Sequence, residues 1–240
     1  MKQIKIGDTK IPYQIKTTQK RKKIALNINQ QGQITVKTPP HKKQDEINQF
    51  LDKKKQWMLN KIKTIEKQKN QNKKKEFLSG EKLPYKGRNY RLKVIKTNID
   101  KPKIKLQQGK FILKTPENKK HQKIYPQIRN QVKTWYKQKA TQHLKKRIKK
   151  YSKQMGIKPQ KTIIKELKNS WGEHKNKQIK INWRIIMAPV NIQDYIIVHE
   201  LTHLKENKHN QKFWNKISTT LPDYKKRIKW LKTKGNQLYF

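Results

Sequence analysis

Three histidines and one glutamate in the last fifth of the sequence have the spacing of a hydrolytic metal site. His199 and His203 are four positions apart, so on an α-helix they lie one turn apart and can bind one metal ion. Glu200 follows the first histidine and can reach a metal-bound water without being a ligand itself. His209 would supply the third protein ligand that catalytic zinc sites use beside one open position. The sequence therefore predicts one zinc ion per chain at His199, His203 and His209, with Glu200 as general base.

The segment that carries the first two histidines is predicted to be a buried helix, because it is apolar on most sides. Pro189 precedes it, Asn191 is a suitable N-cap, and Asp194 stands where the acid of a capping box would be. The six-residue step to the third histidine also occurs in metzincins, but Glu206 stands where they place glycine, and Asn207 is the residue expected to end the helix. An ordinary helix that carries these side chains by chance is the alternative. The apolar flanks and the third histidine argue against it.

A series of short motifs surrounds the histidines. They are Trp171-Gly172, the stretch 181–189, the stretch 198–204, Phe213-Trp214 and Pro222-Asp223-Tyr224. Together they resemble the YgjP-like metal-dependent hydrolases, relatives of other zincin metallopeptidases and of the SprT-like proteases, and residues 11–13 and 77–81 extend the resemblance into the amino-terminal half. The resemblance implies a metallopeptidase with a zincin-like catalytic lobe. In one departure, Glu173-His174 replaces the family's usual Ser-Cys after Trp-Gly.

The expected mechanism assigns roles to further residues. Zinc lowers the pKa of a bound water towards about 7, and Glu200 removes its proton and later passes it to the leaving group. His174 is a candidate for the second electrophilic group, which would contact substrate at the site entrance, and an exposed turn histidine is the alternative. Asp223 is a candidate for orienting a ligand histidine, although a helix N-cap is the simpler interpretation of Pro222-Asp223.

The composition limits the partners without naming one. The chain of 240 residues has a formal net charge of +48, with 56 lysines and seven arginines. Such a charge attracts polyanions, which leaves nucleic acid open as a partner. However, the lysines are spread along the whole chain, whereas phosphate-binding surfaces favour arginine for its bidentate geometry. The abundance of Lys, Asn, Ile and Gln favours genome composition as the cause of the charge.

Three functions from different classes remain. The first is a zinc metallopeptidase that acts on peptides or proteins, the second a metal-dependent hydrolase of nucleotides and other phosphoanhydrides, and the third a DNA-associated protease of the SprT type. No apolar run approaches 18 residues, so no membrane span is expected. The amino terminus lacks the apolar stretch of a signal peptide, and we therefore expect a cytoplasmic protein. The sequence does not indicate an oligomeric state.

The fold class predicted from hydrophobic periodicity is α+β. Residues 1–117 are expected to form a β-rich region with a long helix, and residues 118–240 a zincin-like catalytic lobe. A lysine-rich linker is expected at 70–75, a turn at Trp171-Gly172, and an edge strand beside the metal helix at 179–183, where a peptide substrate can add as a further strand. The other expected strands are 4–6, 12–17, 23–29, 33–37, 90–95, 103–106, 111–114 and 162–166. A long helix is expected to begin after Pro40. Three further helices are expected at 118–151, 211–220 and 223–232.

Overall fold

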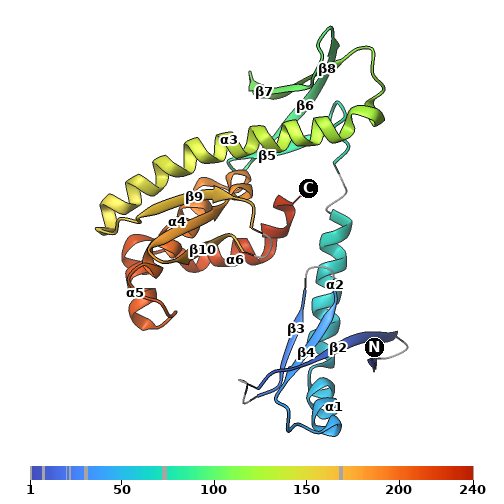
Figure 1. The fold of residues 1–240 in the computed structure, drawn as a ribbon, viewed down its shortest axis with the longest axis vertical. Helices are drawn as coiled ribbons and strands as arrows, with labels where there is room; N and C mark the ends of the chain where they lie inside the picture. Colours follow the sequence, from blue (N-terminus) through green and yellow to red (C-terminus); the bar gives the residue numbers. More distant parts are fainter. Residues whose placement is uncertain are drawn as a thin grey trace. The chain divides into compact units, whose positions relative to one another are not determined.

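The computed structural model describes residues 2–6, 9–19, 21, 23–29, 32–71, 75–167 and 170–239. It confirms the α+β class, with strands concentrated in the amino-terminal half and helices in the carboxyl-terminal part (Figure 1). The chain divides into two compact units, Met1–Lys73 and Lys74–Phe240. The boundary falls in the lysine run predicted as a linker, of which residues 72–74 lie outside the described residues. No helix in the described part of the chain combines the length and the apolar character that crossing a bilayer requires.

The first unit is a four-stranded sheet followed by two helices. The strands are β1 (Lys2–Ile6), β2 (Thr9–Thr17), β3 (Ala25–Ile28) and β4 (Ile34–Thr38), in the order β1-β2-β4-β3, with β2 and β4 parallel. The antiparallel strands β3 and β4 form a hairpin, and residues 30 and 31 of its turn lie outside the described residues. The helix expected after Pro40 is in fact two helices, α1 (Gln44–Lys53) and α2 (Lys55–Gln71). They separate at Lys54, which leaves helical geometry and donates its N–H to the Leu51 carbonyl.

The second unit begins with a sheet of the same topology. Its strands β5 (Lys82–Tyr85), β6 (Arg88–Thr97), β7 (Lys103–Gln107) and β8 (Lys110–Pro116) follow the order β5-β6-β8-β7, and the middle pair is again parallel. The sequences agree as well, because residues 30–39 and 107–116 both begin with Gln-Gln-Gly and end with Lys-Thr-Pro. The two sheets are therefore two copies of one arrangement.

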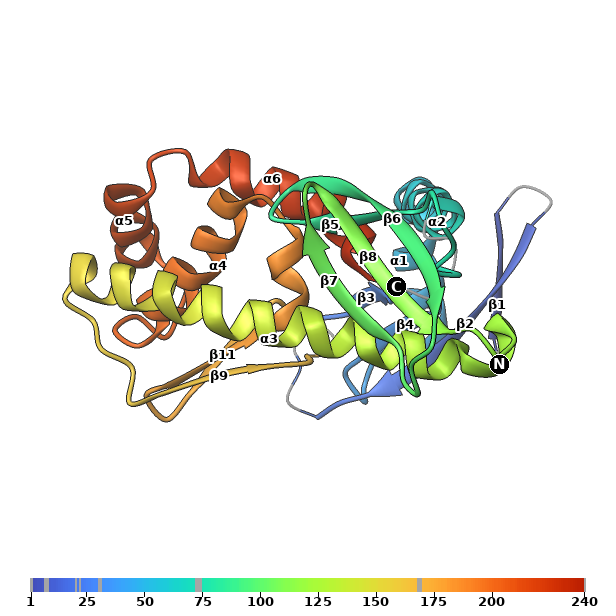
Figure 2. The ribbon, with the colours of Figure 1, turned by 90° about the horizontal axis from the view of Figure 1, so that it is seen from above.

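A 35-residue helix, α3 (His121–Met155), joins this sheet to the rest of the second unit. It runs past β5–β8 and past the later strands (Figures 1 and 2). Its buried face contributes to one core that includes Phe111 of β8 and Trp183 near the metal-site helix. The β5–β6 turn docks here too: the N–H groups of Lys86 and Gly87 donate to the carbonyls of Ile186 and Met187, both at 2.9 Å. The boundary expected at residue 117 differs from this division, because the second sheet shares its core with the segment that follows.

A three-stranded sheet lies beside the helix that carries the histidines. Its strands are β9 (Lys161–Lys165), β10 (Gly172–Lys175) and β11 (Gln178–Asn182), in the order β10-β11-β9. The prediction that residues 179–183 form the edge strand is wrong, because β11 pairs on both sides. The edge beside the histidines is β10, in the segment expected to be only a turn. The chain continues through the 3₁₀ helix η1 (Trp183–Met187), α4 (Val190–His203), α5 (Gln211–Thr220), α6 (Tyr224–Lys234) and η2 (Gly235–Leu238).

The shared core predicts how the chain can be divided. A fragment spanning 74–240 should fold and bind zinc, because it retains every element of that core. A fragment spanning 118–240 should not fold stably, because it exposes the α3 residues that pack on the second sheet. Circular dichroism, melting curves and zinc content of the two fragments provide the test. A stable, zinc-binding 118–240 fragment would show that the second sheet is dispensable.

Candidate metal centre

The structure brings the three predicted histidines together. Their Nε2 atoms lie 3.2 Å apart for His203 and His199, 3.0 Å for His203 and His209, and 3.2 Å for His209 and His199. Three ligands at the usual zinc–nitrogen distance of about 2.0–2.1 Å in a tetrahedral site are separated by roughly 3.3 Å. The described residues contain this one group of at least three potential ligand side chains within metal-binding distance of one another. The cluster therefore has the geometry of a three-histidine metal site.

Hydrogen bonds at the opposite ring nitrogens orient two of these imidazoles. His203 Nδ1 lies 3.0 Å from the Glu206 carbonyl oxygen. A carbonyl only accepts, so Nδ1 carries the proton and Nε2 keeps its lone pair. His199 Nδ1 lies 3.3 Å from the Tyr195 hydroxyl, one helical turn earlier. Such contacts fix ring orientation in metal sites. The lone pairs that converge in the cluster repel one another unless a cation lies between them.

Burial keeps the helix histidines in the form that binds metal. It lowers the pKa of His199 to about 3 and that of His203 to about 4, although the hydrogen bond to the Glu206 carbonyl raises the pKa of His203 in part. Both imidazoles are therefore neutral near pH 7 and need lose no proton to act as ligands. Burial also raises the pKa of Tyr195 to about 12, so its hydroxyl stays protonated beside His199.

Glu200 is buried directly against the edge strand. A Cβ atom at Gly172 would lie 2.5 Å from Glu200 Cγ and 2.5 Å from its Oε1, so a side chain there would require Glu200 or β10 to move. Burial raises the pKa of the Glu200 carboxyl to about 8. Its Oε2 atom is buried and accepts no hydrogen bond from the described part of the chain. A buried carboxylate oxygen without a donor is costly, which fits a group whose partner is a bound ion or water.

His174 reaches the same site from β10. Side chains two positions apart on a strand share one face, and Gly172 and His174 both face α4. The His174 ring stacks on His203 with centroids 4.1 Å apart, and its Nδ1 lies 3.6 Å from Glu200 Oε2. Burial, with a smaller effect from His209, lowers the pKa of His174. His174 therefore lies in a strand, with its ring half-buried against His203.

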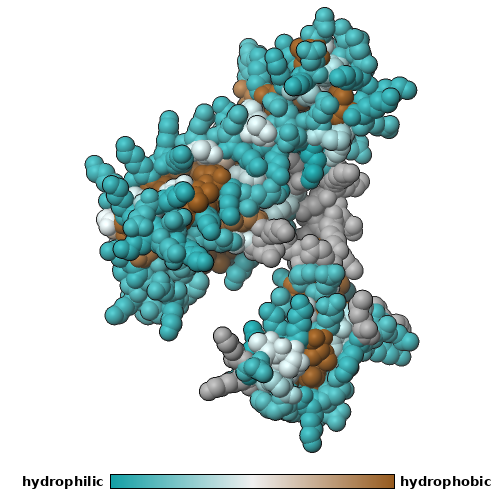
Figure 3. All heavy atoms as spheres, in the orientation of Figure 1, coloured by the Kyte–Doolittle hydropathy of each residue, from teal (hydrophilic) through white to brown (hydrophobic). Residues whose placement is uncertain are grey.

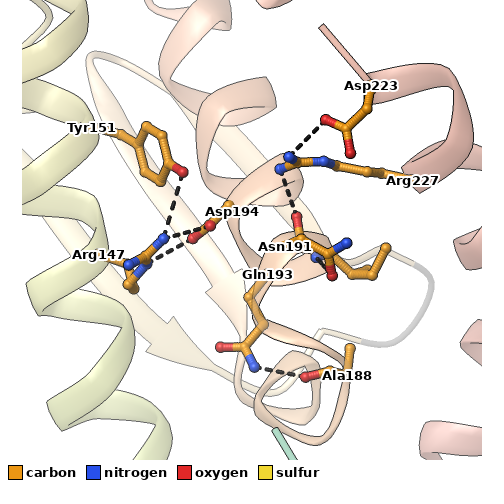
Figure 4. Close-up of polar contacts among 9 residues, drawn as sticks. Arg147, Tyr151, Ala188, Asn191, Gln193, Asp194, Asp223 and Arg227 are labelled. Carbon is orange, nitrogen blue, oxygen red and sulfur yellow. Dashed lines mark hydrogen bonds and ion pairs between the residues drawn. The ribbon is translucent and has the colours of Figure 1, made fainter. Parts of the chain in front are cut away.

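Long-range polar contacts fix the first turns of α4 (Figure 4). Arg147 of α3 donates to both carboxylate oxygens of Asp194, at 2.7 and 2.5 Å, and Arg227 of α6 donates to the Asn191 carbonyl at 2.9 Å. The helix begins at Val190, with Pro189 at the N-cap, so the prediction of Asn191 as N-cap is wrong. The capping-box role of Asp194 is also wrong, because its carboxylate binds a guanidinium on a distant helix.

The chain turns sharply after the second histidine. The helix ends at His203 rather than at Asn207, and the Leu204 N–H donates to the Leu201 carbonyl. The loop that follows returns His209 to the cluster just before α5, where the Asn210 side chain accepts from the Phe213 N–H at 2.9 Å. Phe213 is fully buried, and its ring lies within 4.6–5.0 Å of all three imidazoles, measured between centroids. His209 lies outside α4, so the loop and its packing on Phe213 position this third histidine.

Asp223 lies elsewhere. Its carboxylate pairs with Arg227 at 2.7 Å, and it stands at the N-cap position of α6 without a side-chain capping bond. Tyr195 and Gly172 were not predicted as site residues, yet Tyr195 contacts His199 and Gly172 lies against Glu200. The spacing of four positions before His199 was an available signal for Tyr195. Gly172 had no comparable signal, because its neighbour is distant in sequence.

Comparisons with known proteins complete the description. The family model "YgjP-like, metallopeptidase domain" matches residues 22–234. Among solved structures, the metallopeptidase zymogen of Pyrococcus abyssi abylysin shares 21% identity, with a TM-score of 0.36 over 38% of this chain and 93% of that chain. The comparison with curated proteins found no match.

Proposed function

Because this chain belongs to the YgjP-like family of metallopeptidase domains, we propose that it is a zinc-dependent peptidase that uses Glu200 as its general base. The observation that carries the proposal is the convergence of three histidine Nε2 atoms, 3.0–3.2 Å apart, next to a buried carboxylate. Tetrahedral zinc with three protein ligands, which can all be histidines, and an open position is the form that catalytic zinc sites use.

Glu200 and His174 divide the proton and charge chemistry between them. His199, His203 and His209 would hold a zinc ion, which would supply an electrophile and lower the pKa of a bound water. Glu200 accepts the proton of the attacking water and delivers it to the leaving amine. His174 presents a neutral ring at the same site, from which an N–H can donate to the oxygen on which negative charge develops. This role does not depend on the cysteine that other family members carry there.

The edge strand β10 supplies a place for an extended peptide. It pairs with β11 on one side, and among the described strands its other side has no partner. A substrate strand that pairs there gains affinity from main-chain hydrogen bonds, whatever its sequence. Because Gly172 and His174 bring β10 against Glu200 and His203, such a strand would lie alongside the metal centre.

The zinc site predicts a clear metal-binding result. The wild-type protein should bind about one zinc ion per chain, and His209→Ala should lower the occupancy sharply, because two histidines on one helical turn leave the site a ligand short. Elemental analysis after dialysis against dilute chelator measures the occupancy. His121→Ala is a matched control, since that imidazole contacts the Glu76 carbonyl instead of the cluster. Full zinc retention in His209→Ala would identify another residue as the third ligand.

The peptidase assignment needs its own assay. Zinc-loaded protein should cleave unstructured peptides, and chelation should abolish the activity until zinc is restored. Nucleoside triphosphates and salt-titrated DNA belong in the same panel. Turnover of triphosphates without peptide cleavage would replace this proposal by a phosphoanhydride hydrolase. Peptide cleavage that requires DNA would show that the basic surface recruits the enzyme to nucleic acid.

A further inference from the structure

A cavity of about 260 Å³ opens beside Glu200 and His199. Small-molecule sites usually span roughly 300–1,000 Å³, so this cavity holds one amino-acid side chain more readily than a nucleotide. Because the cavity lies next to the general base and a metal-site histidine, a substrate side chain bound in it would belong to a residue beside the scissile bond. The walls come from the segment that enters β10, from α4 and from α6, chiefly Trp171, Ile196, Ile228, Leu231 and Lys232.

The cavity is apolar with one basic side chain at its rim. Trp171, Ile228 and Leu231 pack on the core yet remain partly exposed, and α6 contains no fully buried residue. The apolar side of α6 therefore borders the cavity instead of being closed off by protein. Lys232 is exposed and is the only lysine or arginine among the described residues that line this cavity. The apolar walls suit an apolar side chain of a peptide, and Lys232 suits an acidic side chain on a neighbouring residue of that peptide.

The walls are held in place before any substrate arrives. Arg227, the residue before Ile228, binds the Asn191 carbonyl on α4 and the Asp223 carboxylate on α6, and so ties one helix to the other (Figure 4). The Trp171 ring lies 5.4 Å from the Tyr239 ring between centroids, and a Cβ atom at Gly235 would lie 3.3 Å from Trp171. A fixed, pre-formed pocket discriminates between side chains because it does not collapse around a small one.

We propose that this cavity is a specificity pocket for a bulky apolar side chain of the peptide substrate, next to the scissile bond, and that Lys232 selects an acidic residue beside it. The inference rests on the peptidase function proposed above. One methylene in an apolar pocket changes kcat/KM by about 10–200-fold, so a peptide with leucine in the pocket should exceed its alanine counterpart by at least about tenfold. An exposed charge pair is weaker, and we expect about two- to fivefold from Lys232.

Four peptides test both parts, with leucine or alanine at the pocket position and glutamate or lysine beside it. Ile228→Trp fills the cavity and should lower kcat/KM for the leucine peptides at least tenfold, while the alanine peptides stay within about twofold of wild type. Lys232→Glu should reverse the preference between the glutamate and lysine peptides. Lys234→Glu is the matched control, because it makes the same change in net charge but lies on nearly the opposite side of α6. It should leave the preference between the two peptides intact. Zinc content and melting temperature show whether each variant is folded.

A binding measurement separates this inference from the proposed function. Calorimetry with zinc-loaded Glu200→Gln protein should show tighter binding of the leucine peptide than of the alanine peptide. Tighter binding without turnover in the wild type would support the pocket and overturn the peptidase proposal. Peptide cleavage with equal rates for leucine and alanine would overturn the pocket alone. If Ile228→Trp does not fold, Leu231→Ala provides the second test, because the enlarged cavity should then favour phenylalanine over leucine. An unchanged preference in that folded variant would also overturn the pocket.

Discussion

Glu200→Gln is expected to keep the zinc ion and the fold while hydrolysis falls by about 10²–10⁴-fold, the usual cost of removing a general base. The amide is nearly isosteric with the carboxyl group, so the close contact with Gly172 is preserved. Burial already favours the uncharged acid by raising the pKa of Glu200 to about 8. The neutral glutamine therefore suits the buried position. Zinc content, melting temperature and turnover are measured on the same preparation.

Glu206→Gln is the matched control for this substitution. Glu206 follows the same helix, but its carboxylate pairs with Lys216 at 2.7 Å in place of entering the site. Turnover in that variant should stay close to wild type. Wild-type turnover in zinc-loaded Glu200→Gln would exclude the glutamate as the base, whatever the substrate is.

The metal-free proteins add a pH test of the same residue. The folded pKa of Glu200 lies above its unfolded value near 4.5, so between these values the folded state binds more protons than the unfolded state. Stability then falls as the pH rises through this range. The melting temperature of metal-free wild type should fall more between pH 5 and 8 than that of metal-free Glu200→Gln. Parallel curves would show that the carboxyl group is ionised in the folded protein.

Gly172→Ala is the second substitution with a large expected effect. The added methyl group would lie 2.5 Å from Glu200 Cγ and 2.7 Å from Cδ, so either the carboxylate or β10 must move. Overpacking of this kind costs about 1–3 kcal/mol of stability, and a displacement near 1 Å of a catalytic group can cost about 10²-fold in rate. Denaturant midpoints and kcat measure the two effects.

A double-mutant cycle identifies the cause. In a Glu200→Ala background the space beside Gly172 is vacated, so Gly172→Ala should then destabilise the protein little. An equal stability loss in both backgrounds would place the strain in the β10 backbone and not in contact with Glu200. Unchanged stability and turnover in the single variant would show that the strand and the helix are farther apart than described.

The sequence predicted the metal cluster better than its surroundings. His199, Glu200 and His203 follow from local helix geometry, and the third histidine from ligand counting. The edge strand could not be predicted in the same way, because Gly172, Glu173 and His174 lack the β-branched and apolar residues by which strands are recognised. It forms a strand because β11 pairs with it and α4 packs on it.

The sequence suggested a different starting point for the second unit than the contacts show, and the reason is a different one. A change from strands to a long helix suggested a boundary at residue 117, but apolar periodicity does not state which sheet a helix covers. Contacts distant in sequence, such as the Tyr136 hydroxyl with the Pro84 carbonyl and Gly87 against Pro189, decide it. The repeated Gln-Gln-Gly and Lys-Thr-Pro segments were a visible signal that the two sheets are alike.

The two matching sheets differ in how freely they can diverge. In the second sheet, Gly87 has a positive φ, and a Cβ there would lie 2.8 Å from the Pro189 Cα, so a mutation in this turn disturbs the start of α4. Selection on the metal centre therefore extends to a hairpin that contributes no ligand. Among the described residues of the first unit, no helix carries metal ligands. Within that unit the matching hairpins have no such helix to support, and a repeated module of this kind is where new recognition surfaces can evolve.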